Sequence, residues 1–188
     1  GTLSVADSLW LRDTMKEKAN ADFLQRNKDY YGAEIYAAPF DQTTVSDINT
    51  WTENATRGMI KELIREISPD SVAYLINALY FSGEWQKKYE KSDISEGTFT
   101  AADGTASRVK TMKSSESVYL SDENTTGFVK AYKGEDFAFA AFLPAEEIPI
   151  NEYVKGFSAE KWQGLFGHSS REPVRCTLPA FSYDFSLT

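Results

Sequence analysis

The sequence has very little of the residue types from which most catalytic, redox and metal sites are built. Its 188 residues include one cysteine, Cys176, and one histidine, His168. A single cysteine excludes an internal disulfide and a thiolate cluster around a metal. It leaves the cellular compartment open, because secreted proteins without disulfides exist.

Long apolar runs and an excess of basic charge are also absent. The longest apolar run, Val72–Phe81, is far shorter than the roughly 20 residues that a membrane-spanning helix needs. Lys and Arg number 20 against 28 Asp and Glu, and the formal charge of −8 repels a phosphate backbone. Neither a membrane nor a nucleic acid is therefore an expected partner. Hydrophobic residues at 41% and charged residues at 26% instead indicate an ordinary globular protein.

No motif of a cofactor, nucleotide or metal site occurs. Walker, Rossmann, zinc and calcium-loop patterns are missing, so no cofactor, no metal and no catalytic residue is expected. His168 lies in a Gly-His-Ser-Ser turn with no carboxylate or cysteine cluster beside it, and no nucleophile-elbow signature occurs. A surface or helix-cap histidine is the favoured interpretation, and an enzyme that uses His168 is the weakest alternative.

The first 40 residues predict a strand, a helix and a second strand. Leu3–Leu11 mixes polar and apolar residues and is typical of a strand. Asn20–Glu34 carries apolar residues on one helical face, with Gly32 where a helix would end. Ile35–Phe40 is short and apolar, and Pro39 near its end suits the edge of a sheet.

A second amphipathic helix is predicted from about residue 46, with Ser46 or Asp47 as its cap. Its apolar stripe recurs at spacings of three and four. The stripe comprises Val45, Ile48, Trp51, Thr52, Ala55, Met59, Leu63 and Ile67. Gly58 interrupts it at a cost of about 1 kcal/mol relative to alanine, so it favours an end of the regular helix or a close packing contact.

Val72–Phe81 is apolar on both faces, as a central strand is when both sides of its sheet are covered. Asn77 in its middle is predicted to be buried and hydrogen-bonded, because an unpaired buried amide costs about 1–3 kcal/mol. Two interpretations of Asn77 stay open. It either fixes the sheet register through neighbouring backbone, or it is a polar latch that holds two elements together until something separates them.

From Phe99 onward, short strands and turns dominate. The expected strands are Ser107–Met112, Ser117–Leu120, Gly127–Tyr132, Phe137–Leu143, Val174–Leu178 and Phe181–Phe185, with a hairpin around Lys133-Gly134-Glu135. Two short helices are expected at Ile148–Gly156 and Ser158–Phe166, the second burying Trp162, Leu165 and Phe166. Because strands and helices come in blocks, the sequence predicts an α+β fold with large, largely antiparallel sheets.

Seven segments, in this order, resemble the serpin family. The most specific is Leu75-Ile-Asn-Ala-Leu-Tyr-Phe-Ser-Gly-Glu-Trp85, which resembles strand 3 of the large A sheet. The others are Leu3–Leu11 (strand 2A), Asn27–Glu34 with Phe40 (helix E and strand 1A), Ile48–Trp51 with Thr56-Arg-Gly58 (helix F), Phe99 with Met112 (sheet C), Phe142–Pro144 (sheet B) and Leu178–Phe181 (strand 2C into 6A).

The resemblance implies a serpin-like fold of A, B and C sheets with covering helices, of which residues 1–188 are one incomplete domain. The opening helices are expected before Gly1, and the hinge, the reactive centre loop and its scissile bond after Thr188. The intact protein is expected to inhibit serine, or cysteine, endopeptidases by inserting the cleaved loop into sheet A, whereas this chain alone should not inhibit. A non-inhibitory carrier or chaperone of the same fold is the main alternative, and a loop-less module that captures peptides is another.

The resemblance also assigns residues that control conformation and perform no catalysis. Asn77 matches the asparagine of the shutter region, and Trp85 matches the tryptophan of the breach at the top of sheet A. Trp51, Thr56 and Gly58 match positions of helix F, which must move aside during loop insertion.

Asp7 departs from the family pattern, because it stands where serpins usually have asparagine. This departure puts in doubt the hydrogen bond that the position makes. The implied partner is a target protease, bound through the missing loop, and the family implies an extracellular location. The chain alone is expected to expose one edge of Val72–Phe81 and therefore to self-associate or to need a complementing segment. The assignment depends on Val72–Phe81 being a middle strand, covered by the helix predicted over roughly Ser46 to Ile64.

Overall fold

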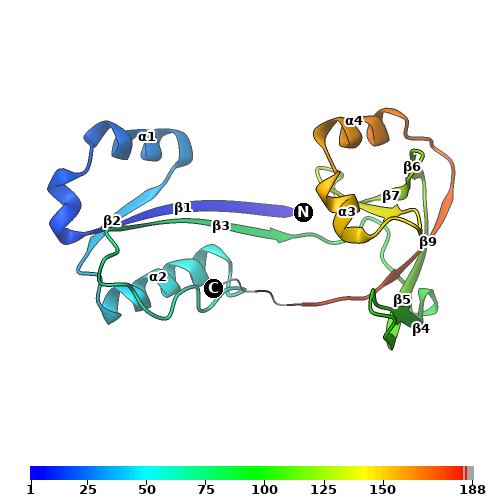
Figure 1. The fold of residues 1–188 in the computed structure, drawn as a ribbon, viewed down its shortest axis with the longest axis horizontal. Coiled ribbons are helices and arrows are strands. Elements are labelled where there is room, and N and C mark those ends of the chain that lie inside the picture. Colours follow the sequence, from blue (N-terminus) through cyan, green and yellow to red (C-terminus); the bar gives the residue numbers. More distant parts are fainter. Residues whose placement is uncertain (184, 186–188) are drawn as a thin grey trace. The chain divides into compact units, whose positions relative to one another are not determined.

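The computed structural model of the chain describes residues 1–183 and 185. It divides into two compact units (Figure 1). The N-terminal unit is Thr2–Ser82, and the C-terminal unit consists of Gly1 together with residues 83–188. The single domain expected over residues 1–188 stays a prediction.

The N-terminal unit is built on a three-stranded sheet in the order β2-β1-β3. Strand β1 (Thr2–Arg12) lies in the middle, parallel to β2 (Glu34–Ala38) and antiparallel to β3 (Ala73–Ser82). The β1–β3 register pairs Thr2 with Ser82 and Leu11 with Ala73. The strands predicted at Leu3–Leu11, Ile35–Phe40 and Val72–Phe81 are confirmed, and β2 with Pro39 after it lies at an edge as expected.

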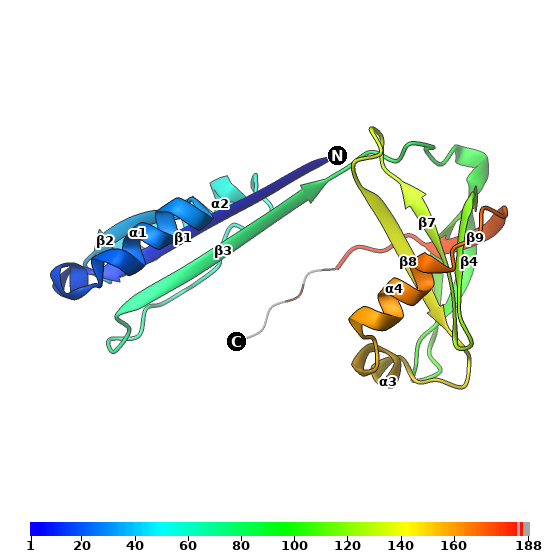
Figure 2. The same cartoon turned by 90° about the horizontal axis from the view of Figure 1, so that it is seen from above.

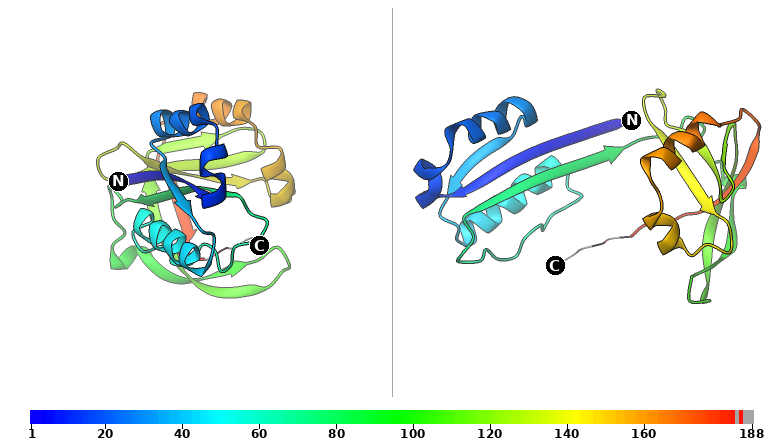
Figure 3. Two further views of the ribbon diagram at one scale, coloured as in Figure 1. Left: turned by 90° about the vertical axis from the view of Figure 1, so that its left-hand side faces the viewer. Right: turned by 45° about the horizontal axis from the view of Figure 1, so that its top comes forward.

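Two helices cover opposite faces of this sheet, as the end-on view of Figure 3 shows. Helix α1 (Ala21–Tyr31) follows the 3-10 turn η1 (Asp13–Lys18). The Asn20 side chain caps α1 by accepting from Asp22 N and Phe23 N, and Gly32 ends it at φ +61°. Both ends match the sequence prediction.

Helix α2 (Gln42–Ala55) begins earlier and ends earlier than predicted. Its cap is Asp41, whose carboxylate accepts from Thr43 N and Thr44 N, so the caps proposed at Ser46 or Asp47 are wrong. The helix ends before Gly58, as the glycine indicated. The residues after it, as far as Ser71, form turns and irregular backbone.

The core of the N-terminal unit lies between the sheet and α2. Every second residue of the strands points to this side. The buried residues of the core cluster are Trp10, Ala38, Phe40 and Ile48. Trp10 stacks on Tyr36 with ring centroids 4.2 Å apart. Partly buried Trp51, Ile64, Ile67, Tyr74 and Ile76 complete the cluster. Of the predicted stripe beyond the helix, only Ile67 therefore reaches the core, and it does so from irregular backbone, whereas Met59 and Leu63 are exposed.

The C-terminal unit contains two three-stranded antiparallel sheets. One has the order β4-β5-β9, formed by Ile94–Thr100, Ala106–Glu116 and Val174–Pro179, with the 3-10 turn η2 (Lys91–Asp93) before β4. The other has the order β6-β7-β8, formed by Val118–Ser121, Thr125–Ala131 and Ala138–Pro144. The hairpin predicted around Lys133-Gly134-Glu135 is the β7–β8 connection.

Helices α3 (Ile150–Lys155) and α4 (Ala159–Gly167) pack against the β6-β7-β8 sheet (Figure 2). Ser158 caps α4 as predicted, accepting from Lys161 N, and Leu165 is fully buried. The Phe142 ring of β8 contacts Phe157, Trp162 and Phe166. Trp162 nevertheless stays 46% exposed, so the prediction that it is buried is wrong.

The predicted strand Phe181–Phe185 is not formed by residues 181–183 and 185, and Asp184 lies outside the described residues. The remaining strands and helices agree with the α+β fold of largely antiparallel sheets predicted from the sequence.

Candidate functional site

Strand β3 is an edge strand of its sheet, not the middle strand that the sequence predicted. One edge pairs along its whole length with β1, and no described residue pairs with the other edge. On one face of the sheet, its apolar side chains are also exposed: Leu75 is 67% and Leu79 60% exposed. The predicted exposure of one edge of this strand is confirmed for the described residues.

Asn77 is exposed, so its predicted burial is wrong, but its predicted hydrogen bond is present. Its Nδ2 donates to Asp7 Oδ1 at 2.9 Å, and Asp7 lies directly opposite on β1. A carboxylate can only accept, so this bond suits aspartate in place of the family's asparagine. The pair connects β3 to β1 and leaves the free edge of β3 unaffected.

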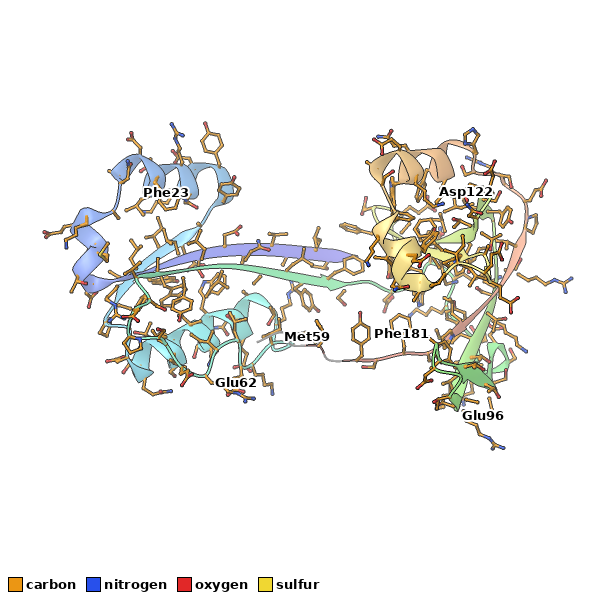
Figure 4. All side chains as sticks on the ribbon, in the orientation of Figure 1. Phe23, Met59, Glu62, Glu96, Asp122 and Phe181 are labelled. Atoms are coloured by element: carbon orange, nitrogen blue, oxygen red, sulfur yellow. The ribbon has the colours of Figure 1, made fainter. Side chains whose placement is uncertain are left out.

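The Asp7–Asn77 pair lines a pocket on the α1 side of the sheet, together with Phe23 and Tyr31 of α1. Figure 4 shows Phe23 on α1 and Glu62, in the segment after α2, on opposite sides of the sheet. The sheet therefore separates Asn77 from the helix F candidates Trp51, Thr56 and Gly58 on the other side.

Trp51 packs on the core cluster, and Thr56 and Gly58 form the end of α2. The buried Thr56 hydroxyl donates to Thr52 O at 2.8 Å and accepts from Ile60 N at 3.0 Å. Gly58 N donates to Glu53 O at 2.7 Å and Arg57 N donates to Asn54 O at 3.2 Å, with Arg57 at φ +52° and Gly58 at φ +83°. This is the hydrogen-bond pattern of a Schellman C-cap, in which Arg57 is the left-handed residue that follows the cap. Thr56 and Gly58 thus lie just beyond the helix and fix the direction of the chain that leaves it.

Asn49 holds this departing segment against α2, and the sequence analysis did not single it out. Its Nδ2 donates to Ile64 O at 2.8 Å, while its Oδ1 accepts from Leu63 N at 2.8 Å and Ile64 N at 3.1 Å. One side chain thereby satisfies three backbone groups that irregular chain would otherwise leave unpaired. An asparagine on the polar side of an amphipathic helix carries no signal that distinguishes this role.

Trp85, in the C-terminal unit, is fixed beside the end of β7. Gln86 N donates to Ala131 O at 3.0 Å, and Lys133 N donates to Glu84 O at 2.7 Å. The indole stacks on Tyr132 with centroids 4.4 Å apart and the rings 9° from parallel. Phe139 meets the same indole edge-on at 5.8 Å.

A buried ion pair lies beneath Trp85, and the sequence analysis did not predict it. Lys130 Nζ of β7 contacts Glu116 Oε1 of β5 at 2.6 Å, and their side chains are 2% and 10% exposed. The ammonium also lies 4.6 Å from the centre of the Tyr89 ring and 5.6 Å from that of Trp85. A lysine within the otherwise apolar strand Gly127–Tyr132 was the available signal.

His168 and Cys176, the two side chains that could have served in catalysis or metal binding, are not arranged for either role. His168 is exposed at the C-cap of α4, with Nδ1 2.8 Å from Gly164 O, as the surface or cap interpretation predicted. Burial raises the pKa of the Cys176 thiol to about 11, so it stays protonated and unreactive at neutral pH. Among the described residues, no helix is long and apolar enough to cross a membrane, and no three His, Cys, Asp or Glu side chains gather as metal ligands do.

Comparison with known proteins gives the class to which this arrangement of sheets belongs. All 188 residues match one family model, Serpin (serine protease inhibitor). The chain belongs to the serpin family, which is a family of protease inhibitors and not of enzymes.

Human Serpin I2 is 29% identical over 97% of this chain and 47% of its own length. Human Serpin B3 is 30% identical over 89% of this chain and 46% of its own length. The chain thus spans about half the length of the curated relatives it matches.

Solved structures agree with this assignment. The thermophilic serpin tengpin in its native state is 41% identical, with a TM-score of 0.89 over 97% of this chain and 47% of tengpin. Tengpin in its latent state gives a TM-score of 0.88 over the same share of this chain and 50% of tengpin. Emu ovalbumin, 21% identical with a TM-score of 0.84 over 95% of this chain and 48% of its own, shows the fold alone.

Proposed function

We propose that this chain is the central part of a serpin that inhibits serine, or cysteine, endopeptidases by inserting its cleaved reactive loop as a strand beside β3. Loop insertion is a known mode of strand addition and of strain release in serpins. The protease supplies the covalent chemistry, and the sheet supplies the conformational change that traps it.

The free edge of β3 is the observation that carries the proposal. The strand has ten residues, it is fully paired on the β1 side, and no strand formed by the described residues pairs with its other side. A long edge with apolar side chains presents unpaired backbone donors and acceptors and is a template for a further strand. In the proposed mechanism, the cleaved reactive loop fills this edge.

Tengpin, a relative with 41% identity, has been solved in both a native and a latent state. These two states support the proposal that the fold allows a change of conformation. The two states match this chain with TM-scores of 0.89 and 0.88 at 41% identity. The fold of the matched half is therefore common to both states. In our proposal, the β2-β1-β3 sheet is likewise the constant frame beside which a new strand is added.

The matched residues have separate proposed roles in this change. Asn77 keeps β3 in register with β1. It does not act as a latch across the edge at which the new strand is added. Thr56 and Gly58 set the path of the segment after α2, and Trp51 anchors α2 on the sheet. Trp85 is proposed to hold the backbone that leaves β3 against β7.

An inhibition assay on a protein that carries this chain together with a reactive loop tests the proposal. Such a protein is obtained by replacing the matched half of tengpin with residues 1–188. We expect the hybrid to form a one-to-one complex with a serine endopeptidase that survives denaturing electrophoresis. Unmodified tengpin serves as the matched control.

A hybrid that folds, by circular dichroism and thermal unfolding, but is only cleaved by the protease would contradict the proposal. That result would favour the alternative of a non-inhibitory carrier or chaperone built on the same fold. A stable complex would instead exclude this alternative for residues 1–188.

A further inference from the structure

We infer that the buried Lys130–Glu116 pair is a positioning device for Trp85, and that it ties β5, β7 and the segment around Trp85 together through one shared charge. The contacts that support this lie within the C-terminal unit. The pair's importance for inhibition rests on the proposed function, whereas its effect on Trp85 is a property of this chain.

The ammonium group of Lys130 meets three separate parts of the chain. Its ion pair of 2.6 Å is to Glu116 at the end of β5, and Lys130 itself lies on β7. The two aromatic rings it faces, Tyr89 at 4.6 Å and Trp85 at 5.6 Å, come from the segment before β4. A cation is attracted to the faces of both rings, most strongly to tryptophan.

Stability alone does not account for charges at this place. Removing two ions from water costs so much that apolar residues of similar volume often stabilise a protein as well or better. A lysine that is 2% exposed would then be expected to be a methionine or a leucine. A charge pair is directional and apolar packing is not. The carboxylate and the two rings must occupy fixed positions around the ammonium.

The other contacts of the Trp85 indole are with aromatic rings, which hold its orientation less strictly than a charge does. Tyr132 stacks on Trp85 in a nearly parallel arrangement, and Phe139 meets its edge. These apolar contacts allow the indole to slide in its own plane. The ammonium that faces both Trp85 and Tyr89 opposes this movement, because displacement of either ring changes its distance to a charge that Glu116 already fixes.

Four variants of the 188-residue chain separate positioning from simple packing. Lys130→Met leaves the buried Glu116 carboxylate without its cation, and Glu116→Gln leaves the Lys130 ammonium without a countercharge while keeping an oxygen that can accept from it. Lys130→Met combined with Glu116→Leu replaces the pair by apolar side chains. Lys161→Met is the matched control, because Lys161 likewise pairs with a carboxylate, Asp122, at 2.8 Å and faces an aromatic ring, Tyr153, at 5.2 Å, but lies on α4 and is 21% exposed.

The chain is labelled with 5-fluorotryptophan, and the fluorine NMR signal of Trp85 is identified among the four tryptophans by its loss in Trp85→Phe. We expect Lys130→Met to lower the melting temperature by about 10 °C and the double variant to recover most of this loss. The Trp85 signal should shift or broaden in all three Lys130 and Glu116 variants, including the double variant, and stay unchanged in Lys161→Met.

A double variant with a recovered melting temperature and an unchanged Trp85 signal would overturn the inference, since the pair would then only fill space. An unchanged signal in Glu116→Gln, which keeps the side-chain shape, would overturn it independently of how well the Lys130 variants fold. Neither result would affect strand addition beside β3, which the inhibition assay tests separately.

Discussion

The Asp7–Asn77 contact joins an acceptor-only carboxylate to an amide donor across two neighbouring strands. The two residues are directly opposite in the register, and the bond measures 2.9 Å. Because both side chains lie on the α1 face of the sheet, the contact adds to β1–β3 pairing and not to the free edge. Its contribution to stability should be that of a single partly exposed hydrogen bond, about 0.5–1.5 kcal/mol.

Exchange of these two side chains tests the contact. Asn77→Asp places two carboxylates opposite each other, and it should lower the free energy of unfolding by about 1–2 kcal/mol at neutral pH. Asp7→Asn should change it little, and the combined Asp7→Asn and Asn77→Asp variant should regain the stability of the parent chain. Urea unfolding measures all three. Equal stability of Asn77→Asp and the parent chain would show that the side chains do not interact.

Gly83 lies where a side chain has no room. A Cβ there would come within 2.6 Å of Tyr132 Cδ1, and the Tyr132 ring is held by its stack on Trp85. We expect Gly83→Ala to destabilise the chain by about 1–3 kcal/mol through overpacking. Gly164→Ala is the control, because nothing lies within 4 Å of its Cβ and helix α4 should gain about 1 kcal/mol. Thermal unfolding that ranks the two variants equally would contradict this account.

Single residues were predictable where chemistry alone decided the outcome. A carboxamide in an apolar strand needs a partner, so the hydrogen bond of Asn77 was foreseen, and its burial was inferred from neighbours that turned out to be exposed. Lys130 was not foreseen, because its partner Glu116 lies on another strand and the pairing depends on tertiary structure. The assignment of Trp85 came from a family motif, and its ring contacts became visible only in the structure.

At the level of elements, helix α2 illustrates why boundaries were less predictable than the existence of the helix. Asp41, Ser46 and Asp47 are all good caps, and the spacing of apolar residues does not choose between them. Beyond the helix, Ile67 of the predicted stripe still packs on the core, but Met59 and Leu63 are exposed, and Ile64, which the stripe did not include, packs there too. Gly58 was the useful signal for the end: it adopts φ +83° in a left-handed turn that also includes Arg57 at φ +52°.

The segment after α2 should depend on Asn49 more than on any apolar contact at its ends. We predict that Asn49→Ala accelerates hydrogen exchange at the amides of Leu63 and Ile64, both of which donate to its Oδ1. The free energy of unfolding should fall by about 1–3 kcal/mol, because backbone groups lose their partners. Asn54→Ala, at an exposed position of the same helix, is the matched control. Unchanged exchange at residues 63 and 64 would contradict this role.

For the whole molecule, the family, the α+β fold and the order of elements were predictable because seven motifs occur in sequence along the chain. The position of β3 was not, since an apolar run on both faces is equally compatible with a middle strand and with an edge strand that awaits a partner. Val72–Phe81 has the composition of a covered strand, yet Leu75 and Leu79 are largely exposed. In our proposal, β3 gains its missing neighbour at the free edge.

Self-association of the isolated chain should follow from the same mismatch. β3 has a free edge, and one face of the β1–β3 pair is exposed and apolar. This face carries Leu3, Val5, Leu75, Leu79 and Phe81. We predict concentration-dependent oligomers in multi-angle light scattering after size-exclusion chromatography. A monodisperse monomer at tens of micromolar would contradict the prediction.

Addition of a strand to β3 is the central claim, and hydrogen exchange of the 188-residue chain with an added peptide tests it most directly. The peptide has about ten residues of small and β-branched type, enough to span β3, and a version with alternate prolines, which cannot complete a ladder, is the control. We predict slower amide exchange at residues 73–82 and a higher melting temperature with the first peptide only. Unchanged exchange across β3 at saturating peptide, or protection confined to β8 or β9, would contradict the account.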